Sequence, residues 1–443
     1  MTTTRHVRRL RTALALGAVG ALTVAGASGA ASAAPAPVAA APSGAASAPA
    51  GDDRAAARAR LDQRLEELTA AGAVGAVAHS RGATGRAWEG AAGVRTIDAA
   101  RPARPGDTAR VASVTKAMVA VLALQEVDRK RWSLETTVDD VWPGLLPGHG
   151  DVTLEQLLSH RSGLPDYILP LLGDAETGTE LVDVLTRDRT DRQLVRAGLS
   201  QPWLFEPGTS YGYSNTNYVV VGLMLQRATH RSVGSLLQQR VFRPAGMRDA
   251  RFPTTGRTFA GPAHIGDYAV LERPYLLDGT SSSVFSSAGA VVASAADIGA
   301  FYRSLMAGKL VSKKSLAQLL TPRTTEPIAY GLGIYRASDP CPDASGRYGT
   351  LYGHDGASFG TITLVFTSAD GTRQASVAFG GRQYTADAPT LPAANRVLVD
   401  ALTSTCARPV PPAAAQRTLG ELDRISADVD ARAERLPEAL TAR

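Results

Sequence analysis

The sequence predicts an α+β fold, with strand-like segments towards both ends of the chain and a mainly helical middle. GAVGAVAHS and GRAWEGAAGV are short strand-like runs separated by glycines, as in a hairpin. TITLVF and QASVAF flank TSADGTR, a turn that contains Asp-Gly and predicts a second hairpin. From Ser113 to about Gly289, between these two regions, helical patterns dominate.

Helices are predicted from the spacing of apolar residues. Leu61, Leu65 and Leu68 fall on one face of an amphipathic helix that begins near Asp53. VTKAMVAVLALQEV is apolar on nearly all sides, which predicts a buried helix. Another helix is expected around residues 296–307.

Residues 406–443 are expected to form a proline-rich spacer and a helical tail. RPVPP follows Cys406, and Leu419, Leu422 and Ile425 then give the tail one apolar stripe. Such a stripe is consistent with a tail that docks on this chain or pairs with another chain. Proteolytic removal of the tail is the third alternative.

Residues 1–33 have the pattern of a secretory signal peptide. Four arginines precede an apolar run at residues 13–25, and small residues at 31–33 offer a cleavage site. The run is too short to span a bilayer comfortably, so we expect a secreted protein without a stable membrane anchor. The general secretory route is favoured, with Arg8-Arg9 leaving the twin-arginine route as the alternative. Residues 34–52 predict a disordered Pro/Ala-rich linker.

Composition and charge fit a globular protein rather than a nucleic-acid binder. The chain has 443 residues, of which 44% are apolar, so it can bury a large core. The formal net charge of +6 includes four arginines of residues 1–33 and no acidic residue from that segment, which leaves +2 on residues 34–443. Without a basic stripe interleaved with aromatics, no nucleic-acid partner is expected. We expect a monomer.

Cys341 and Cys406 are the two cysteines of the chain. Outside the cell, one disulfide between them is favoured, because their spacing fits neither a zinc motif nor a thioredoxin motif. The alternative is a pair of buried thiols.

Near the C-terminal end, GASFG has the Gly-x-Ser-x-Gly pattern of a nucleophile elbow, which would make Ser358 the attacking residue. An elbow needs a helix directly after the serine and a catalytic histidine further along the chain. Here the strand-like TITLVF follows, and no histidine lies beyond His354. GASFG is therefore interpreted as a glycine-rich turn beside a strand.

A better nucleophile is Ser113, which has Lys116 three residues after it in VASVTKAMVA. Positions i and i+3 share one face of a helix, so the amine can reach the hydroxyl. A serine alcohol needs a base, and a desolvated lysine can serve as one. Taken alone, the pair also fits a helix N-cap beside a solvated lysine.

Two further motifs supply groups that such a reaction needs. In Tyr213-Ser214-Asn215, a tyrosine beside the lysine can relay a proton to the leaving group, and the asparagine amide can hold a substrate carbonyl. In His354-Asp355-Gly356, glycine lets the backbone approach a ligand, and the next N–H, of Ala357, can join an oxyanion hole. Each motif alone also fits a structural role. Without clustered Cys, His or carboxylates, no metal site is expected.

The order Ser-x-x-Lys, Tyr-x-Asn, His-x-Gly resembles the serine β-lactamase and penicillin-binding superfamily. It looks most like the branch that holds D-alanyl-D-alanine carboxypeptidases, class C β-lactamases, D-aminopeptidases and certain esterases. The likeness covers roughly residues 53–405 and extends to LEQLLSHRSGLPDY, EPGTSYGYSNTNYVVVGLMLQ, VFRPAGMRDARF, SSAGAVVASAADIGAFYRSLMAGKL and YGLGIY followed by YGHDG.

This resemblance implies a serine β-lactamase/DD-peptidase-like fold with two lobes. One lobe is a mostly antiparallel sheet flanked by helices, from about 53–112 and 290–405, and the other is helical, from about 113–289. The active site lies in the cleft between them, and no cofactor is implied.

The resemblance also implies roles for individual residues. Ser113 is the acylated nucleophile, Lys116 its base and Tyr213 the proton relay, while Asn215 and His354 organise the site. The amides of Ser113 and Ala357 form the oxyanion hole, and Asn215, Asp355, Gly356 and Ala357 contact substrate. His160 resembles a structural position, and Cys341 resembles a disulfide site of exported peptidases.

The expected substrate is a small peptide, an ester or a β-lactam. We expect a secreted D-alanyl-D-alanine carboxypeptidase-like hydrolase that works through an acyl-enzyme. An esterase or D-aminopeptidase of the same fold is the first alternative, and a penicillin-binding sensor without turnover is the second. Carboxypeptidase relatives often carry hydroxyl residues where Asp355 and Ala357 stand and a basic residue one position before Arg336, so a terminal carboxylate is expected to be held poorly.

Overall fold

The computed structural model describes residues 52–433, apart from 174, 255–262, 325–327 and 386–387. The expected signal peptide, the linker up to residue 51 and the last ten residues of the tail lie outside the described residues. No helix within the described residues is long and apolar enough to cross a membrane.

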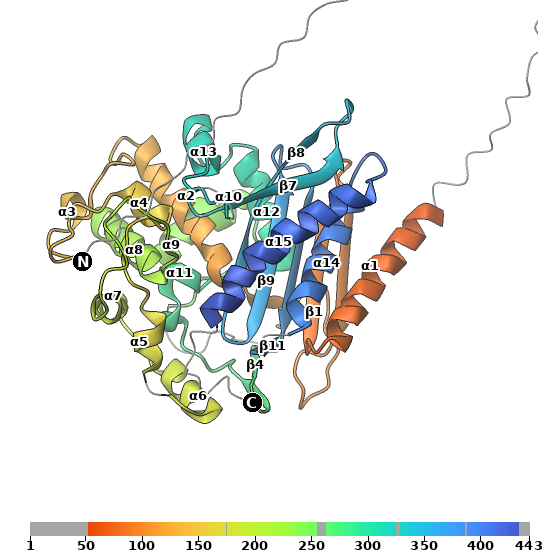
Figure 1. Ribbon diagram of the computed structural model, residues 1–443, viewed down its shortest axis with the longest axis horizontal. Coiled ribbons are helices and arrows are strands. Elements are labelled where there is room, and N and C mark those ends of the chain that lie inside the picture. Colours follow the sequence, from red (N-terminus) through yellow and green to blue (C-terminus); the bar gives the residue numbers. More distant parts are fainter. Residues whose placement is uncertain (1–51, 174, 255–262, 325–327, 386–387, 434–443) are drawn as a thin grey trace, which may run out of the picture. The chain divides into compact units, whose positions relative to one another are not determined.

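A six-stranded antiparallel sheet, built from both ends of the chain, forms the centre of the domain (Figure 1). Both predicted hairpins are confirmed, because β1 pairs with β2 and β9 pairs with β10. Pairing of β1 with β10 then joins the N-terminal hairpin to the C-terminal strands. The strand order is β2-β1-β10-β9-β8-β7, with bounds β1 Gly75–Arg81, β2 Ala87–Gly93, β7 Tyr335–Pro342, β8 Tyr348–Ala357, β9 Thr361–Ser368 and β10 Gln374–Gly380.

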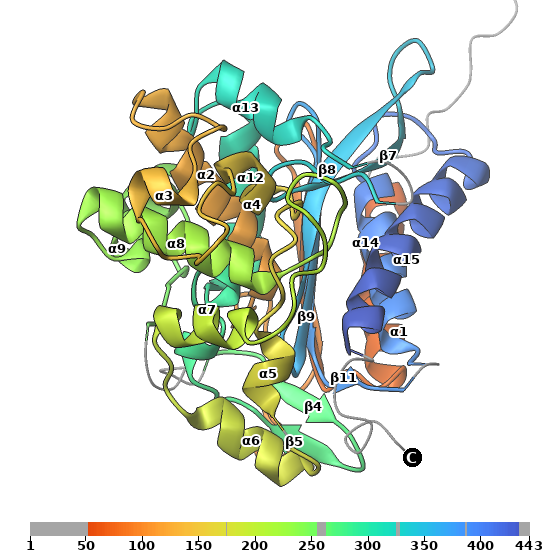
Figure 2. The ribbon, with the colours of Figure 1, turned by 60° about the vertical axis from the view of Figure 1, so that its left-hand side comes forward.

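Three helices cover one face of this sheet: α1 (Asp52–Ala70), α14 (Thr390–Thr403) and α15 (Pro412–Ala433) (Figure 2). The predicted leucine face of α1 is buried in their common core. In α15, Leu422 and Ile425 are buried in the same core. The tail therefore docks on its own chain, and the folded domain extends past residue 405 because α15 covers the sheet.

The helical region lies against the other face. The predicted buried helix is α2 (Thr115–Asp128), in which every side chain from Thr115 to Glu126 is buried. The predicted helix at 296–307 is α12 (Ala295–Met306), which packs on β1 and β10. The remaining helices are α3 Val138–Val141, α4 Leu154–Leu158, α5 Ile168–Leu172, α6 Gly178–Thr186, α7 Asp191–Leu199, α8 Asn215–Thr229, α9 Val233–Leu237, α10 Arg243–Ala245, α11 Ser286–Gly289 and α13 Lys313–Leu320.

Local sequence signals set the beginnings of several of these helices. Thr137, Thr153, Thr177 and Thr190 each cap a helix, and the side chain three residues later bonds back to the cap. Such capping boxes satisfy two N–H groups that a helix leaves without intrahelical partners.

Short strands also occur where helices were expected to dominate. β4 (Tyr268–Val270) pairs with β5 (Pro274–Leu276), and β11 (Arg382–Gln383) joins β4 in parallel. Outside this small sheet, β3 (Thr108–Arg110) pairs with β6 (Val292–Ser294). The helical region is thus not purely helical, and its small sheet includes residue 382, which pairs with Ala269.

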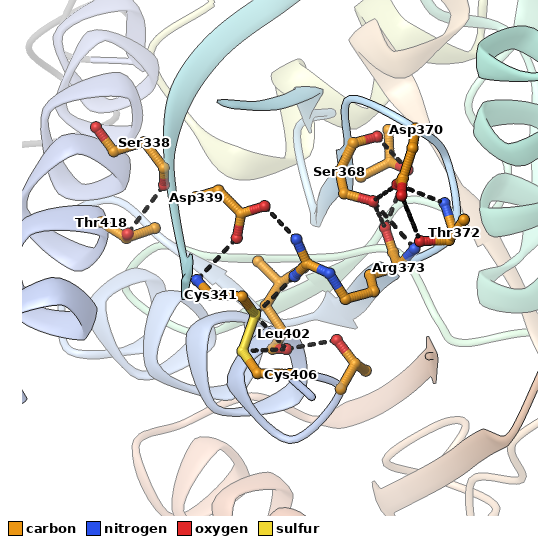
Figure 3. A network of polar contacts seen from close by, with 12 residues as sticks. Ser338, Asp339, Cys341, Ser368, Asp370, Thr372, Arg373, Leu402, Cys406 and Thr418 are labelled. Carbon is orange, nitrogen blue, oxygen red and sulfur yellow. Dashed lines mark hydrogen bonds and ion pairs between the residues drawn. A yellow bond between two sulfur atoms is a disulfide. The ribbon is translucent and has the colours of Figure 1, made fainter. Parts of the chain in front are cut away.

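Cys341 and Cys406 form a disulfide, as predicted (Figure 3). The bridge ties β7 to the chain just after α14. Beside it, Arg373 Nη1 lies 2.7 Å from the sulfur of Cys341, and the same guanidinium pairs with Asp339. The bridge and its polar neighbours therefore fasten the outer edge of the sheet to the helix layer.

Replacing both cysteines with serine is expected to destabilise the fold without changing the chemistry. The bridge closes a loop of 65 residues, so its loss lowers the free energy of unfolding by about 4 kcal/mol in the chain-entropy view. Urea unfolding of wild type and of the double variant measures this difference. An unchanged midpoint, or a fall in kcat for p-nitrophenyl acetate at 25 °C, contradicts this prediction.

Candidate active site

Ser113 lies on a one-turn 3-10 helix, Ala112–Val114, that leads directly into α2. The residue before it, Ala112, has a φ of +44°, a left-handed conformation that is costly for a residue with a side chain. Strained backbone of this kind persists where the surroundings fix it, and it often accompanies a reacting group. Ser113 is only 8% exposed and lines a cavity.

Lys116 lies one turn further along and is fully buried. Its Nζ donates to Ser113 Oγ at 2.9 Å, to Asn215 Oδ1 at 2.7 Å and to the carbonyl oxygen of Ala288 at 2.9 Å. The i, i+3 spacing thus brings amine and hydroxyl together as predicted. A neutral amine in this position can accept the serine proton.

Asn215, the first residue of α8, is held by a residue that the sequence interpretation missed. Asp166 Oδ2 accepts from the backbone N–H of Asn215 at 3.0 Å and from its Nδ2 at 2.8 Å. With Nδ2 on Asp166, the amide oxygen is directed at Lys116. Asp166 lies in the family-like segment LEQLLSHRSGLPDY, but no spacing rule singled it out.

Tyr213 lines the same cavity and lies beside the lysine. Lys116 Nζ is 4.9 Å from the centroid of the Tyr213 ring. On the other side, the ring of His160 packs against Tyr213 with centroids 4.1 Å apart. His160 Nδ1 accepts from the backbone N–H of Ser214 at 3.2 Å, so this histidine holds the Tyr-x-Asn segment in place.

The two expected oxyanion donors meet where β8 approaches the nucleophile. The N–H of Ser358 donates to the carbonyl oxygen of Thr361 at 2.9 Å. Hydrogen-bonded and non-hydrogen-bonded pairs alternate along an antiparallel ladder, so the next pair, Ala357 with Ile362, is a non-hydrogen-bonded one. The N–H of Ala357 is therefore directed away from β9, and the pairing of β8 with β7 ends at Gly353. Contact between β8 and the 3-10 helix brings this N–H to the side of Ser113.

Gly356 does not open the strand to a ligand, which corrects our expectation. A Cβ at this position would lie 2.1 Å from the carbonyl oxygen of Val111 and 3.3 Å from the backbone nitrogen of Ser113. The glycine instead allows β8 to press against the backbone that carries the nucleophile.

Gly356→Ala is expected to lower kcat for p-nitrophenyl acetate by roughly 10²–10³, the cost of misplacing one oxyanion donor. The added methyl meets backbone, which cannot move aside, so β8 must shift away from Ser113. Gly349→Ala on the same strand is the control, because its nearest neighbour would be Asp339 Oδ2 at 3.6 Å. Equal rates in the two variants would refute this account.

His354 lies one layer behind the site, not in it. It is fully buried, its Nε2 is 2.9 Å from the hydroxyl of Tyr330, and its Nδ1 contacts the carbonyl oxygen of Asp355. Burial lowers the pKa of His354, although Asp355 acts in the opposite direction. His354 does not line the cavity, and it supports Tyr330 as a structural group.

Asp355 is likewise misplaced in the sequence prediction. It is 2% exposed and does not line the cavity, so it neither contacts nor repels a substrate there. Its Oδ1 lies 3.3 Å from His354 Nδ1. The sequence motif could not show this depth, because it names Asp355 as the neighbour of Gly356 without fixing where its carboxylate packs.

GASFG covers the last two residues of β8 and the turn that leads to β9, so the predicted turn beside a strand is confirmed. The hydroxyl of Ser358 donates to Asp267 Oδ1 at 2.8 Å, so it stabilises the turn rather than attacking substrate. Arg336 is exposed on β7, away from the cavity.

The cavity contains about 660 Å³ of empty space, open solvent at its mouth included. Apolar side chains form much of its wall, and no cluster of residues suited to a metal ion occurs in the described part of the chain. The lining residues are Ala112, Ser113, Tyr167, Ile168, Tyr213, Asn215, Phe285, Ala288, Gly289, Ala357, Ser358, Phe359, Arg382 and Tyr384.

A serine bonded to a buried lysine, beside a tyrosine and two backbone amides in an accessible cavity, defines a serine hydrolase. The profile of the Beta-lactamase family matches residues 57–385. The chain belongs to this family, and its relatives place it among the class C and penicillin-binding-like members.

Relatives of several activities are similar to this chain. Esterase EstB of Burkholderia gladioli is 33% identical over 48% of this chain and 56% of its own length. Penicillin-binding protein 4* of Bacillus subtilis is 28% identical over 61% of this chain and 60% of its own. The matches thus span less than two thirds of either relative. A D-stereospecific amidohydrolase from Streptomyces sp. has a similar structure, with a TM-score of 0.65, 28% identity and coverage of 73% and 96% of the two chains.

Proposed function

We propose that this protein is an exported serine peptidase that removes a D-amino acid from the end of a cell-wall-type peptide, as a D-alanyl-D-alanine carboxypeptidase does. The observation that carries the proposal is the bonding of Lys116 Nζ to both Ser113 and Asn215. The amine of Lys116 thus links the nucleophile Ser113 to the side-chain amide of Asn215, which in this proposal positions the acyl group of the substrate. Export rests on the pattern of residues 1–33.

The first half of the proposed reaction acylates the enzyme. Ser113 Oγ attacks the scissile carbonyl and passes its proton to Lys116, while the amides of Ser113 and Ala357 bind the oxyanion. Tyr213 then carries a proton to the leaving amine, and the C–N bond breaks to leave an ester on Ser113.

The second half returns the free enzyme. Water takes the place of the leaving amine. Tyr213 removes a proton from this water as the water oxygen adds to the ester carbonyl. Collapse of this adduct breaks the bond to Ser113, whose oxygen regains its proton from Lys116.

The similarity to a D-stereospecific amidohydrolase supports a substrate with a D-amino acid. An esterase is the second candidate. Its support is the similarity to Esterase EstB and the apolar wall formed by Tyr167, Ile168, Phe285 and Phe359, which suits an uncharged acyl ester. A sensor without turnover has less support, because a protein that only binds penicillin needs no proton relay at Tyr213.

Parallel incubation with diacetyl-Lys-D-Ala-D-Ala, D-Ala amide and p-nitrophenyl acetate tests these alternatives. Release of D-Ala from the peptide, at a kcat/KM above that for the amide, supports the carboxypeptidase proposal. Ester cleavage without D-Ala release favours the esterase instead. A stable label from fluorescent penicillin, with no turnover of any substrate, favours the sensor and refutes the peptidase.

A further inference from the structure

Arg382, the first residue of β11, places a buried charge in the wall of the active-site cavity. Its side chain lines the cavity with Ser113, and the residue is only 8% exposed. Nη1 donates to the carbonyl oxygen of Ser358 at 2.7 Å, and the guanidinium carbon lies 4.9 Å from the centroid of the Tyr384 ring. These contacts fix the guanidinium in place.

The guanidinium of Arg382 has N–H donors that are available to a ligand. Within the described residues, no carboxylate pairs with Arg382, and its Nε is buried without a hydrogen-bond partner. The other buried arginine of the described residues, Arg110, differs, since it pairs with Asp267 at 2.6 Å. A buried charge without a counter-ion is costly, so an anion that completes the site gains this energy on binding.

We propose that Arg382 binds the terminal carboxylate of the leaving amino acid and thereby makes the enzyme select free-acid peptides over amides and neutral esters. A guanidinium matches a carboxylate with two parallel N–H···O bonds. Asn215, on α8, and Arg382, on β11, line the same cavity from different elements. With Asn215 assigned to the acyl side, the proposal assigns Arg382 to the leaving side. This inference rests on the proposed function, and it predicts the opposite of the sequence-based expectation that a terminal carboxylate is held poorly.

Two other features support Arg382 in this role. Arg336, the basic residue that the sequence places nearest the usual position, is exposed on β7 and outside the cavity. Arg382 is instead brought to the cavity by the pairing of β11 with β4 and by the turn at Ser358. That turn follows Ala357 directly, so the carboxylate site and one oxyanion donor share a rigid support.

Matched substrates test the proposal in the full-length protein. One pair is diacetyl-Lys-D-Ala-D-Ala and its C-terminal amide, and the other is the 3-carboxyphenyl and 3-carbamoylphenyl esters of N-acetyl-D-alanine. The wild type is expected to prefer the acid in each pair by roughly 10- to 100-fold in kcat/KM, the range of a charge-assisted hydrogen-bonded pair. Arg382→Gln is expected to bring this ratio close to one, and Arg382→Lys to leave an intermediate ratio.

Arg336→Gln is the matched control and keeps the wild-type ratio. A wild-type ratio near one overturns the proposal even if Arg382→Gln does not fold. Equal losses on acid and neutral substrates in a folded Arg382→Gln also overturn it, because they indicate a purely structural role. If the protein cleaves esters but no peptide, the peptidase proposal fails, while the ester pair still decides the role of Arg382.

Discussion

Ser113→Ala is expected to lower kcat for every substrate by about 10⁶, the size of effect seen when a hydrolase loses its nucleophile. The substitution removes one oxygen and keeps the backbone N–H of residue 113, so the oxyanion site remains. Substrate affinity is therefore expected to persist while the covalent step is lost. Fluorescent penicillin labelling and hydrolysis of p-nitrophenyl acetate measure the two properties that depend on the hydroxyl.

Ser358→Ala is the control for this prediction, because Ser358 is the serine of the Gly-x-Ser-x-Gly pattern and lines the same cavity. Its hydroxyl ties the turn to Asp267, just before β4, so its loss is expected to reduce stability and to leave penicillin labelling in place. Labelling that survives in Ser113→Ala but disappears in Ser358→Ala would reverse the assignment of the nucleophile.

Lys116→Met is expected to lower kcat by about 10⁴ or more, the upper range for a general base that also positions its nucleophile. Methionine has a similar length, so it fills the buried space without the amine. Three oxygen acceptors, on Ser113, Asn215 and Ala288, lose their common donor. Steady-state kinetics, together with thermal unfolding, separates the chemical loss from any loss of fold.

The double variant of Ser113→Ala and Lys116→Met gives a sharper result. Residues that act as one unit lose activity non-additively, so the double variant is expected to be no slower than Ser113→Ala alone. Lys313→Met, on the exposed part of α13, is the control for loss of a lysine. A further loss in the double variant would mean that Lys116 contributes separately from Ser113.

Local spacing explains which parts of the site could be predicted. Ser113 and Lys116 are three residues apart, and the helix that follows brings such residues together wherever it packs. The two hairpins are predicted for the same reason, since each depends on alternation and on a short turn. His354 and Asp355 were assigned less well, because their motif fixes neither the register of β8 nor which face of the strand meets the cavity.

The residues found only in the structure come from distant parts of the chain. Asp166 holds Asn215 across 49 positions of sequence, and Arg382 reaches the cavity through a two-residue strand. Neither lies in a pattern with a fixed period, so no local rule relates them to Ser113. Docking of α15 is a similar case, because an apolar stripe indicates that something must cover it without indicating what.

By itself, the sequence determined the serine-hydrolase class of this protein and named its candidate nucleophile, base and proton relay, along with the main strands and helices that carry them. The tertiary structure decided the depth of His354, the exclusion of Asp355 from the cavity and the placement of Arg382 in the cavity wall. The physical reason is that short-range geometry follows from backbone periodicity, whereas burial and the pairing of charges depend on which distant segments pack together.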